Sequence, residues 1–130
     1  MIQHIAHVTL LVKDYDEAIK FYTEKLHFNL VENTYMSETK RWVLIAPSGS
    51  GGCCLLLAKA ASEEQKRSIG NQAGGRVFLF LHTDNFKRDY QNLIDQGISI
   101  EREPSNESYG TVAVFKDLYG NLWDLIEPVL

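Results

Sequence analysis

Residues 5–28, IAHVTLLVKDYDEAIKFYTEKLHF, share their pattern with residues 75–98, GRVFLFLHTDNFKRDYQNLIDQGI, at an offset of 70 residues. Each copy consists of an apolar run, an aspartate and then apolar residues at helical spacing. Asp14 and Asp84 stand where a carboxylate can cap the first turn of a helix. The stretch therefore predicts a strand followed by a helix, twice in one chain.

The residues that follow each helix repeat as well. Residues 41–58, RWVLIAPSGSGGCCLLLA, align without a gap with residues 110–127, GTVAVFKDLYGNLWDLIE, at an offset of 69. Within them PSGSGG and KDLYGN are turn sequences, because Gly and Asn tolerate the left-handed backbone that tight turns require. Each half of the chain thus reads β–α–β–β–β.

The repeat sets the expected domain organisation. We expect one domain, residues 1–130, built of two modules, residues 1–60 and 75–130, with a polar linker over residues 61–74. The two helices are expected near residues 14–25 and 84–95, on the outer faces of the sheets.

Composition excludes several functional classes. The chain has 130 residues, a formal net charge of -4 and a pI near 5.5, which disfavours nucleic acid as a partner. No apolar run approaches the ~20 residues of a membrane span, and the first ten residues do not resemble a signal peptide. Cys53 and Cys54 are adjacent, so a disulfide between them would be strained, and a reducing, cytoplasmic location fits best.

The whole chain resembles the vicinal oxygen chelate superfamily, which comprises glyoxalases, bleomycin-resistance proteins and extradiol dioxygenases. The resemblance rests on HVTLLVKDYDEAIKFYTEKLHF, residues 7–28, and on SYGTVAVFKDLYGNLWDLIEP, residues 108–128. It implies an α+β fold in which two βαβββ modules form a cup-shaped, eight-stranded mixed sheet with helices on the outer faces. His27 departs from the family pattern, which has Gly at the end of the helix, and it is expected to adopt a left-handed backbone.

The resemblance also implies where a metal would sit. In the family, up to four ligands come from the first and last strands of the two modules. The repeat puts His7, Val77, Leu55 and Asp124 at these positions. Only His7 and Asp124 can coordinate a metal, so we expect either no cofactor or one weakly held Zn²⁺, Fe²⁺, Mn²⁺ or Ni²⁺ on these two tentative catalytic residues. The alternative is that they pair directly, with no metal.

Strand alternation predicts the rest of the cup lining, because side chains at i and i+2 share a face. The residues expected to bind a ligand are Thr9, Leu11, Cys53, Leu55, Leu57, Val77, Leu79 and Leu122, with Arg41 and Tyr109 at the mouth. Phe78, Phe80, Val8 and Leu10 are expected to face the helices, so that truncating Phe80 to alanine would cost ~3–5 kcal/mol. His82 is then expected to be structural.

Two functions fit this lining. The first is a small-molecule-binding protein of the glyoxalase/bleomycin-resistance type that holds an apolar or aromatic ligand in the cup. The alternative is a divalent-metal-dependent lyase, isomerase or dioxygenase resembling glyoxalase, with a reduced ligand set. The residues are compatible with an enzyme or with a binding protein. We expect a homodimer that can exchange modules between chains, and no nucleic acid or membrane partner.

Overall fold

The computed structural model describes residues 1–49 and 51–129, and the chain divides into two compact units, Met1–Ile69 and Gly70–Leu130. The first unit is a four-stranded mixed sheet in the order β1-β4-β3-β2. β1 and β4 are parallel and the other pairs are antiparallel. Its elements are β1 (His7–Val12), α1 (Tyr15–Lys20), η1 (Phe21–Lys25), β2 (Asn29–Tyr35), β3 (Arg41–Ala46), β4 (Cys54–Lys59) and α2 (Glu63–Ser68).

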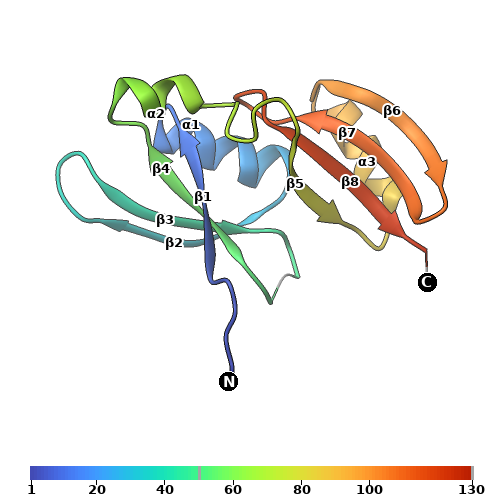
Figure 1. Cartoon of the computed structure of the whole chain (residues 1–130), viewed down its shortest axis with the longest axis horizontal. Coiled ribbons are helices and arrows are strands. Elements are labelled where there is room, and N and C mark those ends of the chain that lie inside the picture. Colours follow the sequence, from blue (N-terminus) through green and yellow to red (C-terminus); the bar gives the residue numbers. More distant parts are fainter. Residues whose placement is uncertain (50, 130) are drawn as a thin grey trace. The chain divides into compact units, whose positions relative to one another are not determined.

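The second unit repeats this topology, in the order β5-β8-β7-β6. Its elements are β5 (Val77–His82), α3 (Phe86–Asp95), β6 (Ile100–Glu107), β7 (Gly110–Lys116) and β8 (Leu122–Pro128). Figure 1 shows α1 against one side of the first sheet and α3 against one side of the second. The predicted α+β fold of two βαβββ modules is confirmed. Among the described residues, no helix is long and apolar enough to cross a membrane.

The helix starts follow the sequence signals, with one shift. The Asp14 carboxylate accepts the Glu17 N–H at 2.9 Å and caps α1, as predicted. In α3 the cap is Asn85, one residue after the predicted Asp84. α2 was not predicted: it begins within the polar linker, after Ser62, whose side chain accepts the Gln65 N–H.

The core of each unit lies between its sheet and the helix that follows its first strand, α1 in the first unit and α3 in the second. In the first unit, β1 contributes Leu10 and Val12, and α1 contributes Tyr15 and Ala18, all of them buried. In the second unit, the sheet residues that face the helix and are fully or almost fully buried are Ala113, Phe115, Trp123 and Leu125. The Glu127 side chain, on the same face of β8 as Trp123 and Leu125, accepts the Phe86 N–H at the start of α3 at 2.7 Å. Each sheet therefore buries the face that meets its helix.

His27 has a backbone φ of 59°, in the left-handed region that its position was expected to require. Gly97, at the corresponding place after α3, has a φ of 69°. Replacing His27 with Gly removes left-handed strain of ~1–2 kcal/mol and adds backbone entropy of ~0.5–1 kcal/mol to the unfolded chain. We expect His27→Gly to raise the free energy of unfolding in urea by ~0.5–1 kcal/mol.

The internal control for this prediction is the reverse change in the second unit. No neighbouring atom lies within 4 Å of a β-carbon built on Gly97, so Gly97→Ala adds backbone strain alone. It should lower the free energy of unfolding by ~1 kcal/mol. Equal stabilities for His27→Gly and the unmodified protein would contradict the account of this helix end.

Candidate functional site

A bulge in β5 decides which of its side chains lie beside Asp124. Val77 pairs with Leu122, but Leu79 pairs with Trp123, so β5 carries one extra residue between these two pairs. Beyond the bulge, Phe80 pairs with Asp124. An extra residue exchanges the faces of all the side chains that follow it.

The predicted faces of β5 are therefore wrong beyond Val77. Leu79 lies on the face of Trp123, towards the helix, rather than in the ligand site. Phe80 is 63% exposed and does not lie beneath α3. His82 pairs with Ile126 and shares the side of the sheet with Phe80 and Asp124. We call this side of the second sheet the Asp124 face.

The strand β4 needs a similar correction. His7 pairs with Cys54 and Thr9 with Leu56, whereas Leu55 and Leu57 pair with Val8 and Leu10. Leu55 and Leu57 are buried and lie on the helix side of the sheet, so the prediction that they share the face of His7 is wrong. Leu57 nevertheless lines a groove between β3 and β4. Residues directly paired across neighbouring strands share a face. Cys54 and Leu56 therefore lie with His7 and Thr9, on what we call the His7 face.

The length of one connection explains this error. Residues 47–53 join β3 to β4, whereas residues 117–121 join β7 to β8, so the first connection is two residues longer. The ungapped alignment, at an offset of 69, consequently misplaced β3 by one residue in one direction and β4 by one residue in the other. Leu56 pairs with Leu44 as Asp124 pairs with Val114, which makes Leu56, rather than Leu55, the counterpart of Asp124. The side chain at that position is a hydrocarbon in either alignment.

The His7 face carries an aromatic contact that the sequence did not reveal. The rings of His7 and Trp42 lie edge to face, with centroids 6.0 Å apart and planes at 75°. Thr9 is exposed and Leu11 is half-buried on the same face. Cys53 is exposed, and its thiol donates to the Cys54 carbonyl at 3.4 Å. Among the two cysteines, Cys54 is thus the direct strand neighbour of His7.

A groove opens where β3 and β4 separate. Their pairing ends at Val43 and Leu57, although both strands continue. The Arg41 N–H donates instead to the Tyr15 hydroxyl, at 3.2 Å. The resulting cavity has a volume of about 600 Å³, within the range of small-molecule sites. Its apolar lining is made by Trp42, Leu56, Leu57, Ala58, Ala60 and Ala61.

Arg41 lines this groove, but its charge is already engaged. Its guanidinium lies 2.9 Å from Asp16 Oδ1 and also donates to Asn33 Oδ1. It stacks on the rings of Tyr15 and Tyr35, and the side chain is only 10% exposed. Arg41 therefore lies at the edge of a cavity, as expected of a residue at the mouth, but its charge is neutralised by Asp16.

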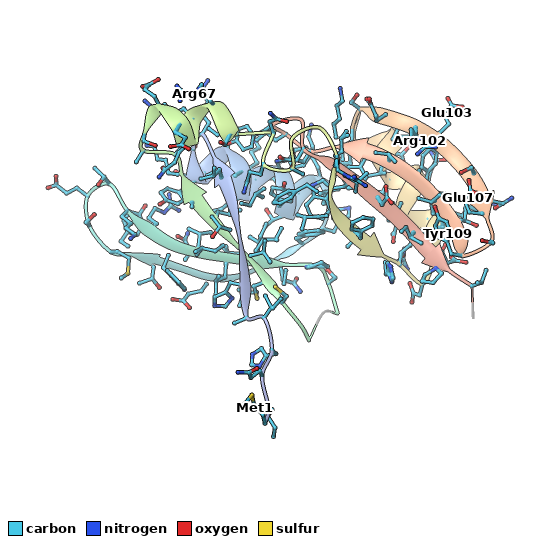
Figure 2. The ribbon with its side chains drawn as sticks, viewed as in Figure 1. Met1, Arg67, Arg102, Glu103, Glu107 and Tyr109 are labelled. Carbon is cyan, nitrogen blue, oxygen red and sulfur yellow. The ribbon has the colours of Figure 1, made fainter. Side chains whose placement is uncertain are left out.

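The Asp124 face has a polar corner that brings together Asp124 and Tyr109, both predicted site residues, with Arg102, which sequence reasoning missed. A small hollow of about 40 Å³ is lined by Asp124, Arg102 and Tyr109, among others. Figure 2 shows Arg102 on β6 and Tyr109 near the turn that leads to β7. Burial raises the pKa of the Asp124 carboxyl, and the attraction of Arg102 partly opposes this rise. Arg102 lies in the polar run IEREPSNE, where no periodic signal marked it.

The raised pKa of Asp124 predicts a pH-dependent stability. The folded protein binds the proton of the Asp124 carboxyl more tightly than the unfolded chain does. The free energy of unfolding therefore falls as pH rises above 3.8, the ordinary pKa of an aspartate side chain. Asn cannot titrate. We therefore expect Asp124→Asn to gain stability relative to the unmodified protein as pH rises above 3.8, as measured by urea unfolding at a series of pH values. A stability difference that is the same at every pH would contradict this.

The residues at the family's metal positions do not make a complete metal centre. Val77 and Leu56 carry no donor atom, which leaves His7 and Asp124. Within residues 1–49 and 51–129, no group of three or more His, Cys, Asp or Glu side chains could hold a metal ion together. Catalytic zinc sites have three protein ligands.

Comparison with known proteins places these features in a wider context. The family model for the Glyoxalase/Bleomycin resistance protein/Dioxygenase superfamily matches residues 4–125. An uncharacterized protein from Shewanella frigidimarina (strain NCIMB 400) is 59% identical over 128 residues, which are 98% of this chain and 95% of that protein. The crystal structure of UcmS2 has a TM-score of 0.84 at 30% identity and covers 98% of this chain and 99% of its own. The crystal structure of TnmS3, an antibiotic binding protein from Streptomyces sp. CB03234, has a TM-score of 0.81 at 27% identity, with 98% of both chains covered.

Proposed function

The chain belongs to the glyoxalase/bleomycin resistance protein/dioxygenase superfamily, and we propose that it is a member that binds an apolar or aromatic small molecule. The observation that carries the proposal is the groove of about 600 Å³ between β3 and β4. Its lining is mainly hydrocarbon, with the Trp42 ring beside it and no carboxylate among its residues. An aromatic ring gains from burial against such a surface.

The likeness to TnmS3, an antibiotic binding protein, supports binding as the activity. The hydrocarbon side chains of Val77 and Leu56 also support it, because they remove donors that metal-dependent family members would use. We propose that His7 serves the ligand as a polar contact, because its ring lies against Trp42, which lines the groove.

The test uses N-phenyl-1-naphthylamine, an uncharged aromatic compound whose fluorescence rises in apolar surroundings. We expect saturable binding of one molecule per chain to the folded protein. The matched variant Ala58→Asp places a charge on the apolar lining and should abolish binding, because a desolvated carboxylate is costly. Circular dichroism shows whether that variant remains folded. Unsaturable fluorescence, or equal binding by a folded Ala58→Asp variant, would contradict the proposal.

We also propose that the protein is a homodimer. All the residues of the edge strands β2 and β6 are exposed, apart from Ile100, which is half-buried. Exposed edge strands can pair with or be covered by another chain. Large apolar side chains are exposed on and next to β2, among them Val31, Tyr35 and Met36. Sedimentation equilibrium at micromolar concentration should give twice the chain mass of 14.8 kDa. A mass of one chain would contradict the proposed dimer.

A further inference from the structure

The rim of the groove between β3 and β4 is positively charged. Lys40 and Lys59 line it, and both side chains are exposed. Neither lysine forms an ion pair with a carboxylate in the part of the chain that the structure describes. The third cation of the rim, Arg41, is matched by Asp16. Two lysine charges are therefore left to act on whatever enters the groove.

The positive charge of this rim is opposite in sign to the net charge of the whole chain. The formal net charge is -4, yet no Asp or Glu is among the residues that line the groove. Positive charges beside an apolar wall act more strongly than the same charges in open water, because the wall lowers the local dielectric. An anionic ligand would be drawn to this groove, and a cationic one would be repelled.

Tyr15 adds a donor at the inner side of the same groove. Its side chain is more than nine-tenths buried, and its hydroxyl oxygen accepts the Arg41 N–H at 3.2 Å. That leaves the hydroxyl proton, which is donated to no acceptor among the described residues. A buried hydroxyl gains from meeting an acceptor, and an anionic oxygen is the stronger kind.

We propose that the ligand of this groove is an amphiphilic anion: an aromatic or other apolar ring system that carries a carboxylate, sulfonate or similar group. The ring lies against Trp42 and Leu56. The anionic group meets Lys40 and Lys59 at the rim, or the Tyr15 hydroxyl further in. This inference rests on the proposed function, because it specifies the chemistry of the ligand at the same site.

The experiment compares two probes with the same ring skeleton. One is 8-anilino-1-naphthalenesulfonate, which is anionic, and the other is N-phenyl-1-naphthylamine, which is neutral. At low salt we expect the anionic probe to bind about tenfold more tightly, from two lysine contacts of two- to fivefold each. This advantage should shrink in about 0.5 M NaCl, where charges are screened within a few ångströms.

Charge variants locate the effect. Lys40→Gln and Lys59→Gln should each weaken the anionic probe by about two- to fivefold and leave the neutral probe within about twofold. Both positions are exposed, so the fold is expected to persist. The matched control is Lys87→Gln, which removes the same charge from an exposed position on α3 and should change neither affinity.

The possible outcomes distinguish the anionic class of the ligand from the proposed function, which is small-molecule binding in the groove. If both probes bind equally, or the two lysine variants behave as Lys87→Gln does, the anionic class is wrong while small-molecule binding stands. If neither probe binds saturably, both the inference and the proposed function are contradicted. Loss of the anionic advantage in Lys40→Gln or Lys59→Gln alone supports the inference.

Discussion

Replacing Phe115 with Ala is expected to lower the free energy of unfolding by ~3–5 kcal/mol, as measured by urea denaturation. Phe115 lies on β7, is fully buried and stacks against the ring of Trp123 at a centroid distance of 5.7 Å. Truncation removes this contact and leaves a cavity in the core beneath α3. The matched variant is Phe80→Ala, which removes the same side chain from the Asp124 face.

Phe80→Ala is expected to cost less than ~1 kcal/mol, because Phe80 is 63% exposed and its removal opens no cavity. The pair of variants therefore measures which face of the second sheet is the core. A loss of several kcal/mol for Phe80→Ala would mean that Phe80 faces the helix, as alternation alone predicts, and does not lie on the Asp124 face.

The repeat was sufficient to predict the architecture. A strand, a helix and three strands recur because the same apolar spacing recurs, and the pattern survives small insertions. The left-handed backbone of His27 was expected from the family pattern, which has Gly at this helix end, and Gly97 adopts a left-handed backbone at the corresponding place after α3. The membership of the superfamily, suggested by residues 7–28 and 108–128, is confirmed by a match over residues 4–125.

The site was less predictable, because a side chain's face depends on an exact residue count. One extra residue in β5 moved Phe80 next to Asp124 and took Leu79 away from it. The connection between β3 and β4 is two residues longer than that between β7 and β8, so Leu56, rather than Leu55, corresponds to Asp124. Neither feature has a local sequence signal, and each reverses a whole strand. The groove at Trp42 was missed because it depends on two strands separating.

Replacing Trp42 with Ala is expected to weaken the binding of N-phenyl-1-naphthylamine by about 30-fold, corresponding to ~2 kcal/mol for an aromatic residue that carries much of a binding site. The ring lines the groove and contacts His7. Fluorescence titration measures the dissociation constant. Trp42→Phe should recover most of the affinity, since it retains an aromatic surface.

The control for Trp42 is Met36→Ala, which removes a large apolar side chain that is exposed outside the groove. This variant should keep the affinity within about twofold. Equal affinities for Trp42→Ala and Met36→Ala, with both variants folded by circular dichroism, would mean that the aromatic ring of Trp42 does not contact the probe.

The proposed place of ligand binding is the groove between β3 and β4. Amide and indole chemical shifts, recorded by NMR while N-phenyl-1-naphthylamine is added, test it most directly. We expect the largest saturable changes on Trp42, Leu56, Ala58 and Ala60, which line the groove. Saturable changes confined to other residues, with these four unaffected, would contradict binding in this groove.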